Sequence, residues 1–186
     1  MKTLALLLTF AAPSAFALDF SGIQNWTGTG ANQAALVIDF ADSGPAYAWG
    51  FRFDGTLSGL SMLKAIDAAD PNLSVQVTSY SFGDAITGLR YGALARGGFE
   101  AGTPGYFGYY TAESTTVQPS SWVSSNVGAG DRTVTNNSWD GYAWAPNFVG
   151  SAPKTNIVSA APVPEPATLA VLGLGAVAML RRKRRA

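Results

Sequence analysis

The chain has 186 residues, twelve of them basic and twelve acidic, and it contains neither cysteine nor histidine. This length suits one domain of ordinary size plus terminal signals, and the missing residue types exclude disulfide bonds, histidine-dependent nucleophiles, His-ligated zinc and His-ligated haem. Residues 18–163 carry eleven acidic and six basic side chains, a net charge of about −5, which argues against a nucleic-acid partner because phosphate binding needs a basic face.

The first 17 residues, MKTLALLLTFAAPSAFA, have the three parts of a secretory signal peptide. Lys2 provides a positive n-region, and residues 4–12 form an apolar h-region of the usual length. Ala15 and Ala17 provide the pattern of small residues that signal peptidase accepts. We therefore expect export and cleavage after Ala17, with Leu18 as the first mature residue. The alternative is an N-terminal core helix.

Residues 18–150 are expected to form one extracytoplasmic domain, and its first elements are two strands. An apolar run at residues 35–40 and the alternating stretch YAWGFRF at residues 47–53 have strand composition, and the turn sequence DSGP lies between them. This arrangement predicts an antiparallel hairpin. One face of the second strand is wholly aromatic, with Tyr47, Trp49, Phe51 and Phe53. We expect Trp49, Phe51 and Phe53 to fill the core.

The stretch SGLSMLKAIDAADP at residues 58–71 predicts one helix. Ser58 is a suitable N-cap, and Pro71 ends the run. Apolar side chains recur on one helix face, with Met62 alongside: Leu60, Leu63, Ile66 and Ala69.

Four further strands are predicted after this helix. Apolar and polar residues alternate at residues 73–80, a second strand is expected at residues 86–91, and the aromatic stretches YFGYYTA and WDGYAWA follow at residues 106–112 and 139–145. A mainly antiparallel sheet with one packed helix is an α+β fold.

From residue 36 to about residue 145 the order of elements resembles the β-grasp domain at the C-terminus of transcobalamin-like proteins. The shared order is a set of strands, a helix of the MLKAI type, the segment ITGLRYG and the aromatic strand YFGYY. The resemblance implies a compact β-grasp sheet and a role in binding a ligand or a surface. It transfers no functional residue to this chain.

Aromatic residues are the strongest candidates for ligand binding. Trp122, Trp139, Tyr142 and Trp144 lie among Ser, Asn and Gly, where loops are expected. Tyrosine and tryptophan combine an apolar ring with a polar group, which suits stacking on a sugar ring. These residues are therefore candidates for glycan binding, and the alternative is that they fill the core.

Carboxylates support no specific site. Asp39, Asp42 and Asp54 lie at turns, and without an EF-hand or a Gly-rich repeat we interpret them as solvated turn residues rather than calcium ligands. Glu100 and Glu113 could form the carboxylate pair of a glycosidase, as any two acids could. No metal, cofactor or catalytic residue is predicted.

The C-terminal region has four parts. Residues 151–163 are small, polar and proline-bearing, so they are predicted to be a linker. Pro164-Glu165-Pro166 should be extended and exposed. Residues 167–180 carry no charge, and as a helix they would span about 21 Å of a hydrocarbon core that is ~30 Å thick. The basic tail at residues 181–185 can extend this span and keeps its end cytoplasmic, so a single transmembrane helix is predicted.

These C-terminal features together resemble the PEP-CTERM protein-sorting signal. They are the motif Val163-Pro164-Glu165-Pro166, the apolar run, and the basic residues Arg181, Arg182, Lys183, Arg184 and Arg185. The resemblance implies processing by an exosortase, a membrane cysteine protease or transpeptidase of Gram-negative bacteria that typically make exopolysaccharide. The alternative is an ordinary single-span anchor.

The sequence thus predicts a non-catalytic protein of the cell envelope or exopolysaccharide matrix, and a weak glycan binder. Its precursor would be anchored in the inner membrane before the product reaches the cell surface or matrix. Its partners would be signal peptidase, an exosortase, the membrane and exopolysaccharide, with no nucleic acid. The alternatives are a secreted carboxylate-dependent hydrolase and a purely structural matrix component.

Overall fold

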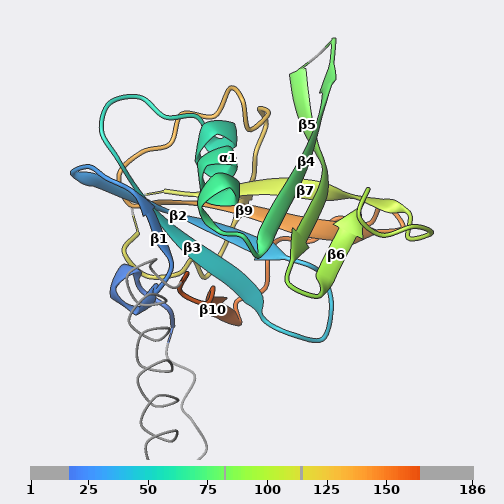
Figure 1. Ribbon diagram of the computed structural model, residues 1–186, viewed down its shortest axis with the longest axis horizontal. Helices are drawn as coiled ribbons and strands as arrows, with labels where there is room; N and C mark the ends of the chain where they lie inside the picture. The colour runs from blue at the N-terminus through green and yellow to red at the C-terminus, as the bar shows by residue number, and fades with distance from the viewer. Residues whose placement is uncertain (1–16, 82, 114, 164–186) are drawn as a thin grey trace, which may run out of the picture.

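The computed structural model describes residues 17–81, 83–113 and 115–163. These residues form a seven-stranded sheet, a three-stranded sheet and one α-helix, which confirms the α+β class (Figure 1). In chain order the elements are η1 Phe20–Gly22, β1 Trp26–Gly28, β2 Asn32–Asp39, β3 Ala46–Phe53, α1 Gly59–Ala69, β4 Leu73–Tyr80, β5 Gly83–Tyr91, β6 Leu94–Gly97, β7 Gly105–Ala112, β8 Val123–Ser124, β9 Ser138–Pro146 and β10 Ile157–Ser159.

The large sheet is built around the predicted hairpin. Its strand order is β1-β3-β2-β9-β7-β8, and β10 also pairs with β3. β2 and β3 are antiparallel, with Leu36 opposite Trp49, so the predicted hairpin is confirmed. β2 pairs in parallel with β9, and β9 is antiparallel to β7. β2 and β9 are therefore flanked by strands on both sides, and most of their residues are buried.

The predicted helix is confirmed as α1, and it packs on one face of this sheet (Figure 1). The hydroxyl oxygen of Ser58 accepts a hydrogen bond from the backbone N–H of Ser61 at 3.1 Å and caps the helix. Leu60, Leu63 and Ile66 are buried as predicted, whereas Ala69 is exposed in the last turn.

Hydrophobic side chains form one core on each face of the large sheet. The core under α1 contains Trp49, Phe51 and Phe53, which confirms that these aromatic residues fill the interior. The opposite face carries a smaller core around Trp139, covered in part by η1 and β10. Both faces are thus protected from water, which explains why the central strands tolerate almost no exposed residue.

The three-stranded sheet consists of β4, β5 and β6 in antiparallel order. β4 begins and ends where the alternating pattern predicted, at Leu73 and Tyr80. The β4–β5 hairpin projects from the domain on the side away from η1 and β10 (Figure 1). Its base packs over the α1 face of the large sheet, where Val75, Val77 and Ile86 join the core.

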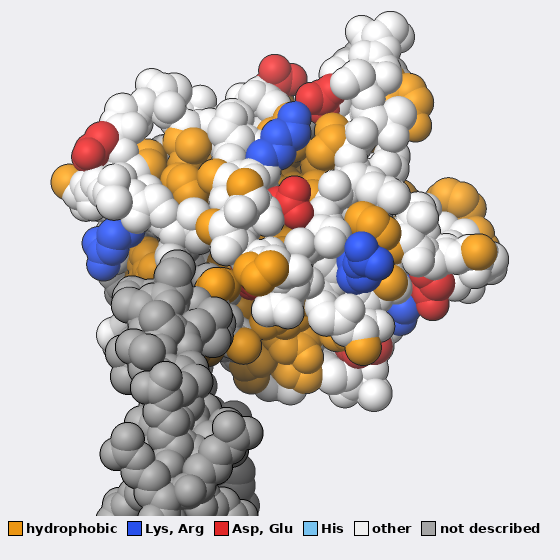
Figure 2. Space-filling model, viewed as in Figure 1, with side chains coloured by type: hydrophobic (Ala, Val, Ile, Leu, Met, Phe, Trp, Pro, Cys, Tyr) orange, Lys and Arg blue, Asp and Glu red, His pale blue; other side chains and the backbone are white. Residues whose placement is uncertain are grey.

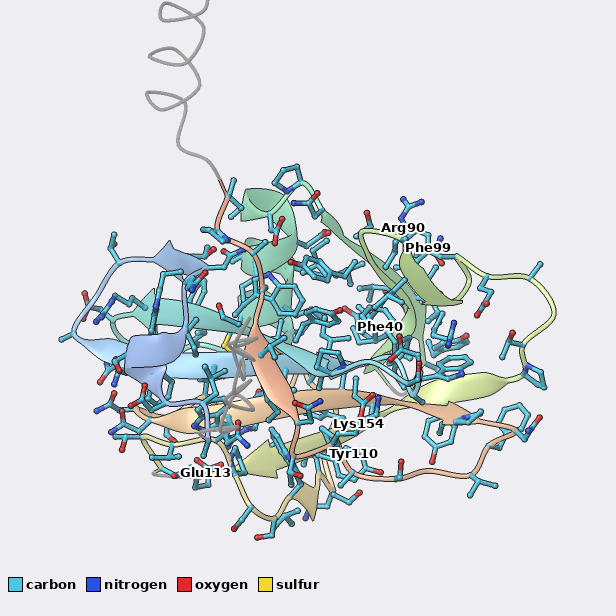
Figure 3. All side chains as sticks on the ribbon, turned by 90° about the horizontal axis from the view of Figure 1, so that it is seen from below. Phe40, Arg90, Phe99, Tyr110, Glu113 and Lys154 are labelled. Carbon is cyan, nitrogen blue, oxygen red and sulfur yellow. The ribbon has the colours of Figure 1, made fainter. Side chains whose placement is uncertain are left out.

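The predicted linker at residues 151–163 is not a free segment, because part of it is packed on the domain. β10 pairs in parallel with β3, and Ile157 is buried. The ammonium group of Lys154 lies 3.0 Å from the carboxylate of the buried Asp39 and donates to the carbonyl oxygens of Asp42 and Gly44 (Figure 3). Small and polar residues can therefore form a strand and an ion pair when distant partners supply the contacts.

Two predicted segments lie outside the described residues: the signal sequence up to residue 16, and residues 164–186 with the sorting motif, the membrane helix and the basic tail. In the part of the chain that is described, no helix is both long and apolar enough to cross a membrane.

Candidate functional site

A mostly apolar pocket of about 270 Å³ lies on the α1 face, between the first residues of β5, which follow the β4–β5 turn, and the large sheet. β7 and β9 supply its aromatic walls, β5 supplies the opposite wall, and the loop before β9 supplies the remainder. The lining residues are Asp84, Ala85, Ile86, Tyr106, Phe107, Tyr109, Val127, Gly128, Ala129 and Tyr142. Apolar walls with a few polar groups are typical of sites for small ligands.

Tyr142 lines this pocket, and its hydroxyl is buried without a partner in the described part of the protein. Its side chain is 1% exposed, and its hydroxyl has no hydrogen-bond partner among the described residues. The ring lies parallel to that of Tyr109, with centroids 4.9 Å apart. Burial, and then the nearby Asp140 carboxylate, raise the pKa of the Tyr142 hydroxyl well above its ordinary value, so it stays protonated.

A buried polar network supports the aromatic wall. The Tyr109 hydroxyl donates a 2.5 Å hydrogen bond to Oδ2 of Asp140, which is fully buried on β9. Oδ1 of Asp140 lies 3.4 Å from Nε of Arg132, which also pairs with Glu113. Burial raises the pKa of Asp140, while the bonds from Tyr109 and Arg132 act in the opposite direction. The N-terminal residue of α1, Gly59, lies against both Tyr109 and Asp140.

A pair of exposed aromatic rings lies near the start of β7 and just after β9. Tyr106 is 46% exposed and Phe148 is 68% exposed, and their rings are nearly parallel, with centroids 6.5 Å apart. Asn147 and Phe148 both have left-handed backbone conformations, with φ of 53° and 63°. Such conformations are costly for a bulky residue and are held by the surrounding structure. Here the backbone N–H of Asn147 donates to the Pro104 carbonyl at 2.8 Å.

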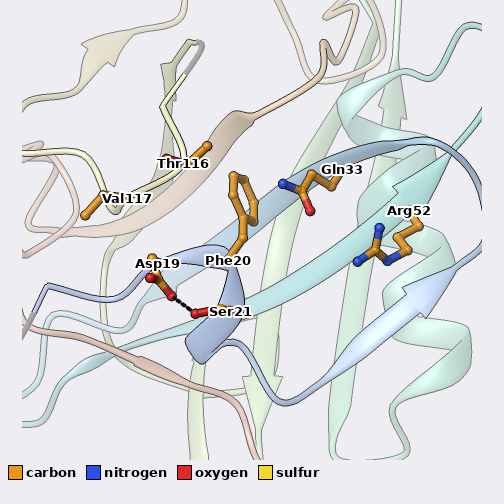
Figure 4. A pocket seen from close by; sticks show the side chains of 7 residues that line it. All are labelled: Asp19, Phe20, Ser21, Gln33, Arg52, Thr116 and Val117. Atoms are coloured by element: carbon orange, nitrogen blue, oxygen red, sulfur yellow. Dashed lines mark hydrogen bonds between the residues drawn. The ribbon is translucent and has the colours of Figure 1, made fainter.

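A more polar pocket of about 380 Å³ lies beside η1 (Figure 4). Its lining residues are Asp19, Phe20, Ser21, Gln33, Arg52, Thr116 and Val117. The Ser21 hydroxyl and then the Gly22 N–H donate to the Asp19 carboxylate and lower its pKa. The guanidinium of Arg52 lies over the Trp26 ring, 4.7 Å from its centroid. The charged groups of this pocket are thus already engaged within the fold.

The predicted glycan-binding residues do not form an exposed surface. Trp139, Tyr142 and Trp144 are on β9 and at most 2% exposed, so their expected position in surface loops is wrong. β9 lies between β2 and β7 and is covered on both faces, which buries every aromatic ring that it carries. Trp122 is half-buried and packs over Gly141. Of the four residues, the apolar pocket contains only Tyr142.

The acidic candidates are engaged in separate contacts. Glu100 pairs with Arg96 at 3.0 Å, and Glu113 pairs with Arg132. Asp39 is buried against Lys154, which corrects its interpretation as a solvated turn residue. Across the described ranges, no group of three or more Asp and Glu side chains could hold a metal ion.

Charged side chains are scattered on the face seen in Figure 2, and no continuous basic surface forms there. Arg90, one of the few basic side chains, lies over the ring of Phe99, 4.6 Å from its centroid (Figure 3).

The chain is held by the domain almost up to the C-terminal motif. Ala160 is fully buried, and its N–H donates to the carbonyl of Ala48 at 2.8 Å. The carbonyl of Ala161 accepts a 2.8 Å bond from Nδ2 of Asn25, and its N–H donates to the Tyr91 hydroxyl at 2.9 Å. The backbone N–H of residue 24 also donates to the hydroxyl of residue 159, so the N-terminal segment lies beside the last residues before the C-terminal motif.

Sequence reasoning missed Tyr106, Tyr109, Asp140 and Phe148 as parts of a site. The alternation within β7 indicates that Tyr106 and Tyr109 lie on opposite faces, but it does not show which face is covered. No local pattern signals the left-handed turn at Phe148. The pocket combines residues from three strands and a loop, and only the fold brings these together.

Comparison with known proteins identifies a sorting motif at the C-terminal end of the chain. The family model described as the PEP-CTERM protein-sorting motif matches residues 162–185. No curated protein and no solved structure matches the chain. The chain therefore carries a PEP-CTERM protein-sorting motif, as its C-terminal residues predicted. This motif indicates an extracytoplasmic protein that is made as a membrane-anchored precursor and processed by an exosortase.

Proposed function

We propose that the described domain is a non-catalytic module that binds glycans weakly on the surface of the cell or in its exopolysaccharide matrix. The observation that carries this proposal is the exposed pair of Tyr106 and Phe148. Aromatic faces at the surface suit the apolar face of a pyranose ring, and the Tyr106 hydroxyl can bond to a sugar hydroxyl. The glycan site thus moves from the buried β9 aromatics to this pair.

Backbone strain supports a functional role for the pair. The left-handed conformation of Phe148 costs about 1–3 kcal/mol, and it places an apolar ring in water rather than in the core. If Phe148 had no role, its ring could pack back onto the protein, or a polar residue could occupy the position. A binding role explains why both costs are retained.

Affinity electrophoresis tests glycan binding, in gels that contain dextran, xylan or hydroxyethyl cellulose. We expect at least one polymer to retard the protein and Phe148→Ala or Tyr106→Ala to weaken this retardation about fivefold, equivalent to ~1 kcal/mol. Val149→Ala is the matched control, because Val149 is 72% exposed and adjacent but not aromatic. Equal retardation of all three variants, or no retardation by any polymer, would contradict the proposal. Trp139→Ala is unsuitable because that ring is buried.

Two other functions can be tested beside this one. A carboxylate-dependent hydrolase would lose activity on Glu113→Gln or Glu100→Gln without losing its fold. Each of these carboxylates is paired with its own arginine, which favours a structural role. A purely structural matrix component would bind no glycan and hydrolyse none.

The strand order supports a β-grasp assignment for the core of the domain. The segment β2–β3–α1–β7–β9 forms an antiparallel hairpin, a helix and two later strands, with β9 parallel to β2 at the centre. On this proposal the β4–β6 sheet is an insertion between the helix and β7. The ligand-binding role implied by the resemblance agrees with the two aromatic features described above.

For sorting, we infer that residues 167–180 anchor the precursor and that Glu165 is read by the exosortase. Two features support this: the motif match, and the position of the motif just after the clamped residue Ala161. Similarly, Leu18 is bonded to Gln118 on both sides of its backbone, which supports a mature domain that begins after Ala17. Signal peptidase would release this end and the exosortase the other.

Glu165→Ala tests the role in sorting, because a lone carboxylate between prolines has no evident folding role. In a host with the matching exosortase, we expect the full-length precursor to accumulate in the membrane fraction while export and fold are unchanged. Glu100→Ala is the control for loss of an acidic side chain elsewhere. If blots of membrane and medium show Glu165→Ala processed like the wild type, the tail is a plain membrane anchor instead.

A further inference from the structure

We propose that the peptide bound by the exosortase extends from the sorting motif back into the folded domain, and that the hydrogen bonds on Ala161 must open before the chain is processed. This inference rests on the proposed role of the motif in sorting, and it adds the step that sets the rate of processing. We call the hydrogen bonds that hold Ala160 and Ala161 the C-terminal clamp.

The C-terminal clamp engages the backbone groups of both residues. The N–H of Ala161 donates to the Tyr91 hydroxyl at 2.9 Å, and its carbonyl accepts a bond from Nδ2 of Asn25 at 2.8 Å. The N–H of Ala160 donates to the carbonyl of Ala48 at 2.8 Å, and the Ala160 side chain is fully buried. While the clamp is closed, these groups are therefore not available to another protein.

The motif lies very close to the clamp in the sequence. Glu165 is four residues beyond Ala161, and an extended chain spans at most about 3.6 Å per residue, so the Cα atoms of these two residues are within about 14 Å of each other. Proteins that recognise extended peptides commonly pair with the peptide backbone over several residues. An enzyme groove that holds Glu165 and the few residues before it thus reaches the clamped residue.

Prolines restrict which backbone groups of the motif can pair with an enzyme. Every second residue from 162 to 166 is proline, which has no backbone N–H, so only Val163 and Glu165 can donate within this stretch. In an extended chain, alternate residues direct their N–H groups to the same edge. Ala161, Val163 and Glu165 would therefore form one row of three donors. The first of them is bonded to Tyr91 in the folded domain, and opening of the clamp completes the row.

The clamp belongs to a part of the fold that can open without global unfolding. β10 has only three residues, and it pairs with β3 at the edge of the large sheet. Short terminal segments open locally at a much lower free energy than the whole domain. When such opening is fast relative to cleavage, the rate of cleavage follows the fraction of chains that are open. A weaker clamp should thus give faster processing.

Tyr91→Phe tests this step, because it removes the acceptor of the Ala161 N–H and keeps the ring. We expect faster hydrogen exchange of the Ala161 amide in the purified precursor. In a host with the matching exosortase, pulse-chase labelling should show processing about fivefold faster than in the wild type. Tyr47→Phe is the matched control and should be processed at the wild-type rate. Its ring packs on that of Tyr91, with centroids 5.0 Å apart, but its hydroxyl is not part of the clamp.

Insertion of Gly-Ser-Gly-Ser-Ala after Ala161 tests the same step while the clamp stays closed. The motif is still preceded by Ala-Pro in this variant, but it now follows a free segment. We expect processing at least as fast as in Tyr91→Phe, and no further acceleration when the two changes are combined. If Tyr91→Phe does not fold, the insertion alone decides.

Glu165→Ala in the same experiment separates this inference from the sorting proposal on which it rests. If Glu165→Ala accumulates as precursor while Tyr91→Phe and the insertion are processed at the wild-type rate, the motif is read without residue 161 and only this inference is overturned. If Glu165→Ala is processed like the wild type, the sorting proposal fails and this inference fails with it.

Discussion

Asp70 is a buried carboxylate that connects the end of α1 to three other parts of the domain, and Asp70→Ala removes all these connections. Its Oδ2 accepts bonds from Nε1 of Trp49 at 2.8 Å and Nδ2 of Asn25 at 2.9 Å. Its Oδ1 accepts a 2.9 Å bond from the N–H of Asn72. Because Asn25 also donates to the carbonyl of Ala161, the Asp70 carboxylate indirectly positions the residues that precede the sorting motif.

The expected loss in the free energy of unfolding follows from the number of hydrogen-bond donors that Asp70→Ala leaves unpaired. A hydrogen bond to a charged group contributes about 1.5–3 kcal/mol, but such contributions are not additive within one network. Leaving a buried donor without a partner costs about 1–3 kcal/mol, and Asp70→Ala leaves the buried Trp49 and Asn25 donors unpaired, so we expect a loss of about 2–4 kcal/mol. Asp67→Ala is the matched control on the same helix. Asp67 is only half-buried and accepts a single 3.1 Å bond from Val75, so we expect a loss of about 1 kcal/mol.

Urea unfolding followed by tryptophan fluorescence measures both losses. Hydrogen exchange of the Ala160 and Ala161 amides measures the effect on the exit segment, and we expect faster exchange in Asp70→Ala than in Asp67→Ala. If the two variants lose the same free energy, or if these amides exchange at the wild-type rate, Asp70 does not hold the C-terminal segment through Asn25.

Three other changes test the packing of the same domain. Gly59→Ala should cost about 1–3 kcal/mol in urea unfolding, because its Cβ would overlap the Tyr109 hydroxyl and stand 2.8 Å from Asp140, whereas Gly128→Ala, with open space around it, should be neutral. Ile66→Asp should cost at least about 3 kcal/mol, since it places a charge on the buried face of α1, and a loss below about 1 kcal/mol would mean that this face is not packed. Burial raises the pKa of Tyr109 and Tyr142 above the ordinary value of 10.0, so the folded state keeps protons that the unfolded state releases, and stability should fall as pH rises above that value. Spectrophotometric titration should show these two tyrosines ionising only on unfolding, and their ionisation in the native protein would contradict the burial argument.

The local sequence pattern was sufficient to predict the elements that have one buried and one exposed face. Residues 73–80 alternate over a half-buried strand, and β4 has those bounds. The face with Leu60, Leu63 and Ile66 requires a helix, and Ser58 provides an acceptor for an otherwise unpaired N–H. The sorting motif was also readable in the sequence, because extended prolines, an apolar run and basic residues are recognised in linear order.

The tertiary structure decided which aromatic residues are accessible. Trp139 and Trp144 have loop-like neighbours in the sequence, but β9 pairs with β2, about one hundred residues earlier, and is thereby buried. Residues 151–163 are composed like a linker, yet pairing with β3 and a bond to Asp39 hold them on the domain. A short segment carries no periodicity that reveals a distant partner. Exposure of Phe148 and the isolated hydroxyl of Tyr142 likewise depend on which chain segments cover each face, and that depends on long-range pairing.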